Sequence, residues 1–146
     1  LDAGGDVWVK EGGQSDITAA VVARIAQACP AVDATARIHV VQHSDWNENQ
    51  TTESALTFTK QATHYIRIRD ANTYLNVKGG NEPFVKAACQ HPDFGAIWKA
   101  AFAYYPSKER LDFSDTGELM HMVGLGEMDL DAFRKRFLDA SSENEK

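Results

Sequence analysis

Short apolar runs alternate with amphipathic stretches through the first half of the chain. Residues 6–10 and 36–42 are largely apolar, and residues 63–69 alternate between apolar and polar positions. Each run predicts a β-strand, and a continuous apolar run is typical of a strand covered on both faces. Residues 15–30 and 53–61 repeat apolar side chains at helical spacing instead. Strands separated by helices pair in parallel, so the pattern predicts an α/β fold with a mostly parallel, Rossmann-like sheet flanked by helices.

The second half of the chain has a different pattern and predicts mostly helices. Gly79-Gly80 and the stretch "YYPSKERLDFSD" separate its elements. The predicted helices cover residues 83–90, 94–105, 116–123 and 130–138. We expect a single domain over residues 1–140 with a helix-rich C-terminal half, followed by a polar tail at residues 141–146.

The composition of the chain excludes some classes of binding partner, but it says little about which reaction the chain could catalyse. The 146 residues carry a net charge of −6, which argues against nucleic acid or an anionic membrane as the main partner. No apolar run approaches the roughly 20 residues that span a bilayer. The location stays open between the cytoplasm and a secreted or periplasmic site after processing. Cys29 and Cys89 are expected as buried thiols, with a single disulfide as the alternative.

The turn after the first predicted strand is a candidate ligand-binding segment. Gly12-Gly13 lacks the spacing of a dinucleotide-binding fingerprint. Glycine nevertheless lets the backbone approach a ligand closely, and open α/β sheets bind ligands at the carboxyl ends of their strands. The alternative is a tight strand-to-helix turn with no further role.

The polar stretch after the second predicted strand, "HSDWNENQTT", fits neither a helix nor a strand comfortably. It combines carboxylates, amides and one aromatic ring, which suits hydrogen bonding to sugar hydroxyls and stacking on a sugar face. The alternative is a solvated loop in which Thr51 or Thr52 caps the next helix. The side chains of interest here are His43, Asp45, Trp46, Asn47, Glu48 and Asn49.

A third candidate is the start of the predicted helix at residues 116–123. Asp115 stands before this helix and Glu118 follows three positions later, which resembles a capping box. Asp115 could instead bind a hard cation such as calcium through oxygen, although one carboxylate does not make a site. No H-E-x-x-H or comparable histidine pair occurs, so zinc is not expected. Neither a serine nor a cysteine nucleophile motif is present.

The order of these pieces resembles the nucleoside hydrolase-like superfamily, in particular its divergent bacterial branch. The matching stretches are "VWVKEGGQSDITAAVV", "IHVVQHSDWNENQTTESALTFTKQATHYIRI" and "LDFSDTGELMHMVGLGEMD". The resemblance implies hydrolysis of an N-glycosidic or related ribosyl bond by calcium-activated water. It places Gly13, through its carbonyl, and Asp115 at the metal. The residues that it implies for the sugar or nucleoside-like substrate are Glu11, Gln14, Asp45, Trp46, Asn47 and Asn49.

The chain departs from this superfamily at its N-terminus. The aspartate cluster that supplies most calcium ligands and the catalytic base has no counterpart before Val7, because Asp2 and Asp6 do not match its spacing. We therefore expect an incomplete domain, the C-terminal half of a longer protein, and assign no catalytic residue. Its open sheet edge is expected to recruit the N-terminal half or another copy of the chain. The alternative is a carbohydrate-binding, small-molecule-binding or interaction module without catalysis.

Overall fold

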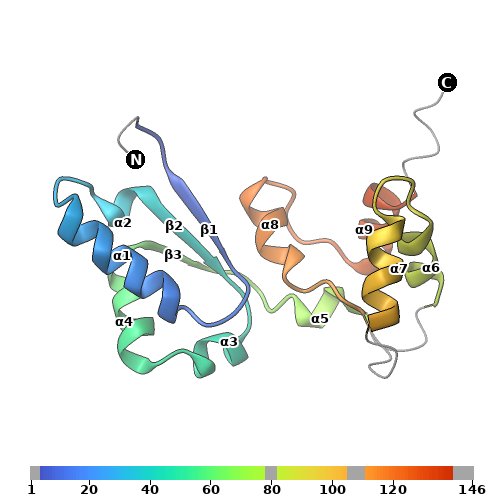
Figure 1. Cartoon of the computed structure of the whole chain (residues 1–146), viewed down its shortest axis with the longest axis horizontal. Coiled ribbons are helices and arrows are strands. Elements are labelled where there is room, and N and C mark those ends of the chain that lie inside the picture. Colours follow the sequence, from blue (N-terminus) through green and yellow to red (C-terminus); the bar gives the residue numbers. More distant parts are fainter. Residues whose placement is uncertain (1–3, 78–81, 105–110, 140–146) are drawn as a thin grey trace. The chain divides into compact units, whose positions relative to one another are not determined.

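The computed structural model describes residues 4–77, 82–104 and 111–139 (Figure 1). The chain divides into two compact units. Unit 1 comprises Leu1–Ala71 and Asp115–Gly126, and unit 2 comprises Asn72–Ser114 and Glu127–Lys146. The chain therefore leaves unit 1 after its sheet and returns to it for one helix.

Unit 1 contains a three-stranded parallel sheet. Its strands are β1 (Val7–Glu11), β2 (Ile38–Gln42) and β3 (His64–Arg67), in the order β1-β2-β3 (Figure 1). In the register, Val9 pairs with Val40 and Val40 with Tyr65. The predicted α/β fold with parallel strands is confirmed at this level. The Rossmann-like class and the incomplete domain stay predictions.

Two helices cover one face of the sheet in unit 1. α1 (Asp16–Ala28) and α4 (Glu53–Ala62) contact each other, and Val22 of α1 packs with Ile38 and Val40 of β2 in the core. These three side chains are almost fully buried, which is worth roughly 1.5–3 kcal/mol each relative to exposure. The core therefore forms between the sheet and α1, and the loops at the strand ends stay at its margin.

α8 (Thr116–Met122) belongs to unit 1 although it comes from the far end of the sequence. It contacts β1 and β2. Its buried residues include Glu118 and Met120. This return of the chain brings a carboxylate-bearing helix to the same two strands that precede the glycine turn and the polar stretch.

Two sequence predictions around β2 are wrong in detail. Residues 36–37 belong to α2 (Ala34–Arg37), because Asp33 caps this turn by accepting a hydrogen bond from the Ala36 amide. The supposed loop at residues 43–52 contains α3 (Asp45–Gln50). This helix has six residues, which are too few for a helical repeat of apolar side chains to be recognised in the sequence. Ser44 Oγ caps it by accepting a hydrogen bond from the Trp46 amide at 3.1 Å.

Unit 2 is built mainly from short helices around aromatic side chains. Phe113 lies with its ring centroid 5.0 Å from Phe84, 6.0 Å from Phe133 and 4.6 Å from Trp98. The four helices predicted beyond residue 82 are confirmed, including α8 of unit 1, whereas Gly79-Gly80 lies outside the described residues. The elements of unit 2 are α5 (Asn72–Leu75), β4 (Asn76–Val77), α6 (Glu82–Gln90), α7 (Gly95–Tyr104), β5 (Leu111–Asp112) and α9 (Leu130–Phe137).

The prediction that both cysteines are buried is wrong. Cys29 is exposed, Cys89 is partly exposed, and neither forms a disulfide. Cys29 is the C-terminal cap residue of α1, beyond the last buried turn of that helix, which explains its exposure. No helix in the described part of the chain is long and apolar enough to cross a membrane.

Candidate metal centre at the sheet edge

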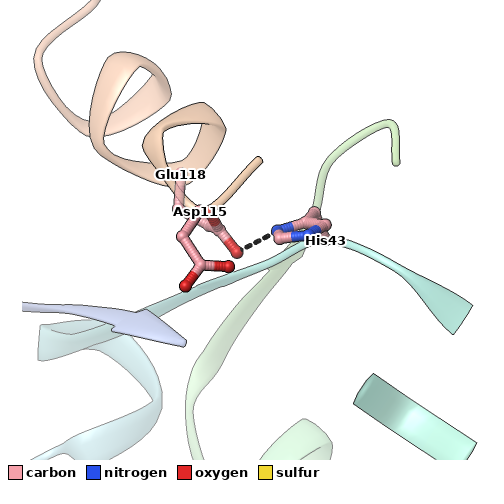
Figure 2. A group of neighbouring side chains, drawn as sticks. All are labelled: His43, Asp115 and Glu118. Carbon is pink, nitrogen blue, oxygen red and sulfur yellow. Dashed lines mark hydrogen bonds and ion pairs between the residues drawn. The ribbon is translucent and has the colours of Figure 1, made fainter. Parts of the chain in front are cut away.

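Three side chains of unit 1 that could ligate a metal converge beside the carboxyl ends of β1 and β2. His43 directly follows β2, whereas Asp115 precedes α8 and Glu118 lies in its first turn. One potential donor atom from each residue lies within 4.8 Å of the others. Figure 2 shows Glu118 directed at the His43 ring with Asp115 beside it. Segments far apart in sequence therefore build one cluster.

The innermost contact of this cluster joins His43 and Glu118. Glu118 Oε1 is hydrogen-bonded to His43 Nδ1, and the two residues are 0% and 1% exposed. Glu118 Oε2 is buried as well, and no described residue offers it a hydrogen bond. Leaving a buried polar atom unsatisfied is costly, and more so for a charged group. A cation beside Oε2 would remove this cost.

The protonation of His43 follows from these neighbours. Burial lowers the pKa of His43, but the hydrogen bond and the charge of Glu118 raise it, and the charges of Asp115 and Asp70 add to the rise. The net effect is a pKa above the usual value of 6.5. The neighbouring carboxylates thus favour the protonated, positively charged form of the His43 imidazole.

Asp115 is the accessible member of the cluster. Its side chain is 55% exposed, and Oδ2 lies 3.4 Å from Lys10 Nζ. The predicted capping box is wrong, because Asp115 makes no side-chain hydrogen bond to the helix and Glu118 is directed at His43 instead. Asp115 is therefore free of the helix-capping role that would have explained it.

The glycine turn leaves room for Asp115. A Cβ on Gly12 would lie 2.8 Å from Asp115 Oδ2 and 2.6 Å from Lys10 Nζ, whereas a Cβ on Gly13 would meet nothing within 4 Å. Both contacted atoms end flexible side chains, so an alanine at Gly12 would displace the charged pair rather than the backbone. Gly12 thereby allows the carboxylate to lie against the end of β1.

Buried amides hold the turn and the end of β2 in place. Gln42 Nε2 donates to the Gly13 carbonyl at 2.9 Å, and Asn47 Nδ2 donates to Gln42 Oε1 at 3.2 Å and to the His43 carbonyl at 3.3 Å. The Gly13 carbonyl, which the resemblance implies as a metal ligand, thus accepts an amide proton here. Its role as a ligand stays a prediction.

The backbone beside His43 is strained. Ser44 has a φ of 72°, the one positive φ of a residue other than glycine in the described ranges. Such a conformation costs on the order of 1–3 kcal/mol and persists only where the surroundings enforce it. It turns the chain from β2 into α3 directly after the buried imidazole. Strain of this kind is common at binding and catalytic sites.

Glu11, at the end of β1, is a second buried carboxyl group close to this cluster. Its Oε2 accepts a hydrogen bond from Thr18 Oγ1 at 2.5 Å. Burial raises the pKa of Glu11 above 4.5, the Thr18 hydrogen bond lowers it, and the charge of Glu118 raises it further. The net result is a raised pKa, as expected for neighbouring carboxyl groups in a poorly hydrated place.

The residues expected to bind a sugar divide into two sets. Glu11 and Asn47 are buried and hydrogen-bonded within unit 1. Asp45 forms an ion pair with Arg67 at 2.5 Å, and Trp46 is 62% exposed on α3. Gln14 and Asn49 are exposed too. Their roles in substrate binding stay predictions, and the exposed set is the one that a solute can reach.

Sequence reasoning missed the pairing of His43 with Glu118, which lies at the centre of the cluster. A weak signal was available: Glu118 precedes the apolar Leu119 and Met120 in a predicted helix, and a carboxylate that is buried with them needs a partner. His43 directly follows β2, a strand that is buried throughout. The identity of the partner could not be read from spacing, because 75 positions separate the two residues.

Comparisons with known proteins identify no relative of this chain, so its function is inferred mainly from the geometry of the cluster. A scan against protein-family models finds no match, and searches of curated proteins and of solved structures find none either.

Proposed function

We propose that this chain is part of a nucleoside hydrolase-like hydrolase that acts on an N-glycosidic or related ribosyl bond. Its cation would be held by His43, Asp115 and Glu118. The observation that carries the cation site is the buried, unpartnered Oε2 of Glu118 in a cluster whose donor atoms lie within 4.8 Å of one another. The reaction class rests on the resemblance of the motifs around this cluster.

The donor set fits a divalent cation, but only partly fits calcium. Asp115 and Glu118 offer carboxylate oxygens, which suit any divalent ion. The third donor is an imidazole nitrogen, whereas calcium takes oxygen ligands. When bound, a divalent cation lowers the pKa of water and so supplies a nucleophile near neutral pH.

The chain's own residues would prepare this site for a solute. Gln42 and Asn47 fix the ends of β1 and β2 through buried amide hydrogen bonds. Asp115 is reachable from solvent, and the exposed Trp46 ring offers an apolar surface on which a sugar can stack. Holding a sugar in a fixed orientation near the carboxylates is the positioning that hydrolysis requires.

The cation site is tested by binding and the reaction by product release. Metal-stripped protein should gain thermal stability with a divalent cation, because a ligand of the native state raises the melting temperature. Asp115→Asn should weaken this gain, while Asp93→Asn, an exposed carboxylate of unit 2, should leave it unchanged. Absence of any cation response in the unaltered protein would refute the site.

For the reaction, the cation-loaded protein is incubated with inosine and with p-nitrophenyl β-ribofuranoside. Release of hypoxanthine or p-nitrophenol that Asp115→Asn abolishes would support the hydrolase. No release by the loaded protein would reject it.

The second candidate function is a non-catalytic module that binds a carbohydrate or a small molecule. The exposed Trp46 ring on α3 favours it, because an exposed ring offers an apolar face on which a sugar can stack. Binding of ribose or a nucleoside that Trp46→Ala removes, with no release of product, would select this function over the hydrolase.

A further inference from the structure

We infer that the cluster of His43, Asp115 and Glu118 selects a first-row divalent transition ion, such as Zn²⁺ or Mn²⁺, over calcium. The inference rests on the proposed cation site and concerns which chemical class of ion that site takes. The sequence points the other way, because it holds no zinc-type histidine pair and its family resemblance implies calcium.

The first support is the chemistry of the donors. Imidazole is a ligand for zinc, iron, nickel and copper, and mixed imidazole and carboxylate sets also hold manganese and iron. Calcium needs six to eight oxygen ligands. His43 occupies the buried centre of the cluster, so a calcium ion placed there would face a nitrogen where it needs an oxygen.

The second support is the balance between fixed and movable donors. Four-coordinate zinc with bonds of about 2.1 Å holds its ligand atoms roughly 3.4 Å apart. The donors here lie within 4.8 Å of one another, so the widest gap among them needs to close by at most on the order of 1 Å. His43 and Glu118 are buried, and an entering ion would release to solvent the proton that their hydrogen bond now shares. Asp115 is exposed and is the donor that can move.

The third support is the number of donors. Two fixed donors and one movable donor make three protein ligands, the number found in catalytic zinc sites, which keep one position open. Glu118 Oε2 is an unsatisfied acceptor in the interior, and an ion that enters the cluster itself would give it a partner. A small ion with few ligands meets this requirement, whereas an ion that gathers many oxygens from the surface does not.

The test compares ions on the full chain after chelator treatment. Dissociation constants for Zn²⁺, Mn²⁺ and Ca²⁺ are measured by calorimetry, with thermal shifts in parallel. We expect Zn²⁺ and Mn²⁺ to bind at least about ten-fold more tightly than Ca²⁺. Asp115→Asn should weaken Mn²⁺ binding, and it leaves the buried pair of His43 and Glu118 unaltered. His121→Asn, which removes an exposed imidazole on α8, should change nothing.

A spectroscopic readout identifies the nitrogen ligand without relying on activity. Pulsed electron paramagnetic resonance of bound Mn²⁺ should show ¹⁴N coupling that persists in His121→Asn and disappears in His43→Gln. Calcium binding as tight as manganese, or bound Mn²⁺ without ¹⁴N coupling, would overturn the inference while leaving a cation site in place. If none of the three ions binds, the proposed cation site fails as well.

Discussion

His43 Nδ1 and Glu118 Oε1 are hydrogen-bonded in the interior of unit 1, although 75 positions of sequence separate the two residues. Both side chains are almost completely buried. The pair fastens α8 to the end of β2 and is at the same time the fixed part of the candidate metal centre. The same atoms therefore stabilise the fold and belong to the candidate metal centre. Variants must be chosen so that an effect on stability can be told from an effect on metal binding.

Replacing Glu118 with glutamine should destabilise unit 1. The amide keeps the size of the side chain but loses the charge that pairs with His43, which leaves buried polar groups imperfectly matched. Such a loss costs about 1–3 kcal/mol of unfolding free energy. Urea unfolding at neutral pH measures it. Glu53→Gln, an exposed carboxylate in the first turn of α4, provides the matched control and should change little. Equal stabilities of the two variants would contradict a structural role for the pair.

The stability of metal-free protein should fall as the pH rises above about 6.5. Burial lowers the pKa of His43, but the hydrogen bond and charge of Glu118 raise it above 6.5 overall. Folding therefore favours the protonated imidazole, and its contribution is complete below pH 6.5 and lost as the pH passes the raised value. Urea unfolding in a chelating buffer across pH 6 to 9 measures this slope.

His43→Gln provides the comparison for this pH dependence. It removes the titrating group while keeping a side chain that can hydrogen-bond, so the slope above pH 6.5 should flatten. The raised pKa of Glu11 also makes stability fall as the pH rises above 4.5, and this contribution persists in the variant. A wild-type slope that His43→Gln retains in full would assign the pH dependence to another group.

The parallel sheet could be predicted because its signal is local. The apolar runs of β1 and β2, separated by an amphipathic helix, leave few other arrangements. α3 could not be predicted, since its six residues are held by Ser44 Oγ and a strained φ rather than by apolar periodicity. Local patterns thus locate the sheet edge but not the short helix upon it.

The candidate site was predictable only in part for a similar reason. Asp115 could be named because it stands at a helix start near a strand end, where both capping and metal binding are common. The choice between these roles depends on where Glu118 points, and that direction is decided by the buried His43 across the fold. A contact between residues 75 positions apart produces no recognisable motif in the sequence.

Gly12→Ala should weaken cation binding while Gly13→Ala does not. An added Cβ at Gly12 would come within 2.8 Å of Asp115 Oδ2, so the carboxylate has to leave the position from which it faces His43 and Glu118. A Cβ at Gly13 meets nothing within 4 Å and serves as the matched control. Calorimetric titration with Mn²⁺ measures the difference. Identical affinities for the two variants would show that Asp115 reaches the ion without needing the space above Gly12.

Lys10→Met should strengthen cation binding. Lys10 Nζ lies 3.4 Å from Asp115 Oδ2, so an incoming ion competes with this ammonium for the carboxylate. Partly exposed pairs of this kind contribute at most about 1 kcal/mol, which limits the gain to roughly five-fold in the dissociation constant. Methionine keeps the apolar stem and removes only the charge. Calorimetric titration with Mn²⁺ at fixed ionic strength measures the effect.

Two further variants separate local competition by Lys10 from a general change in charge. Lys60→Met removes one positive charge from α4, where Lys60 pairs with Glu48 at 3.1 Å, and should leave the affinity nearly unchanged. The gain from Lys10→Met should also vanish when Asp115→Asn is present, because the shared partner is then gone. An equal gain from both lysine variants would instead attribute the effect to net charge, and it should then disappear at high salt.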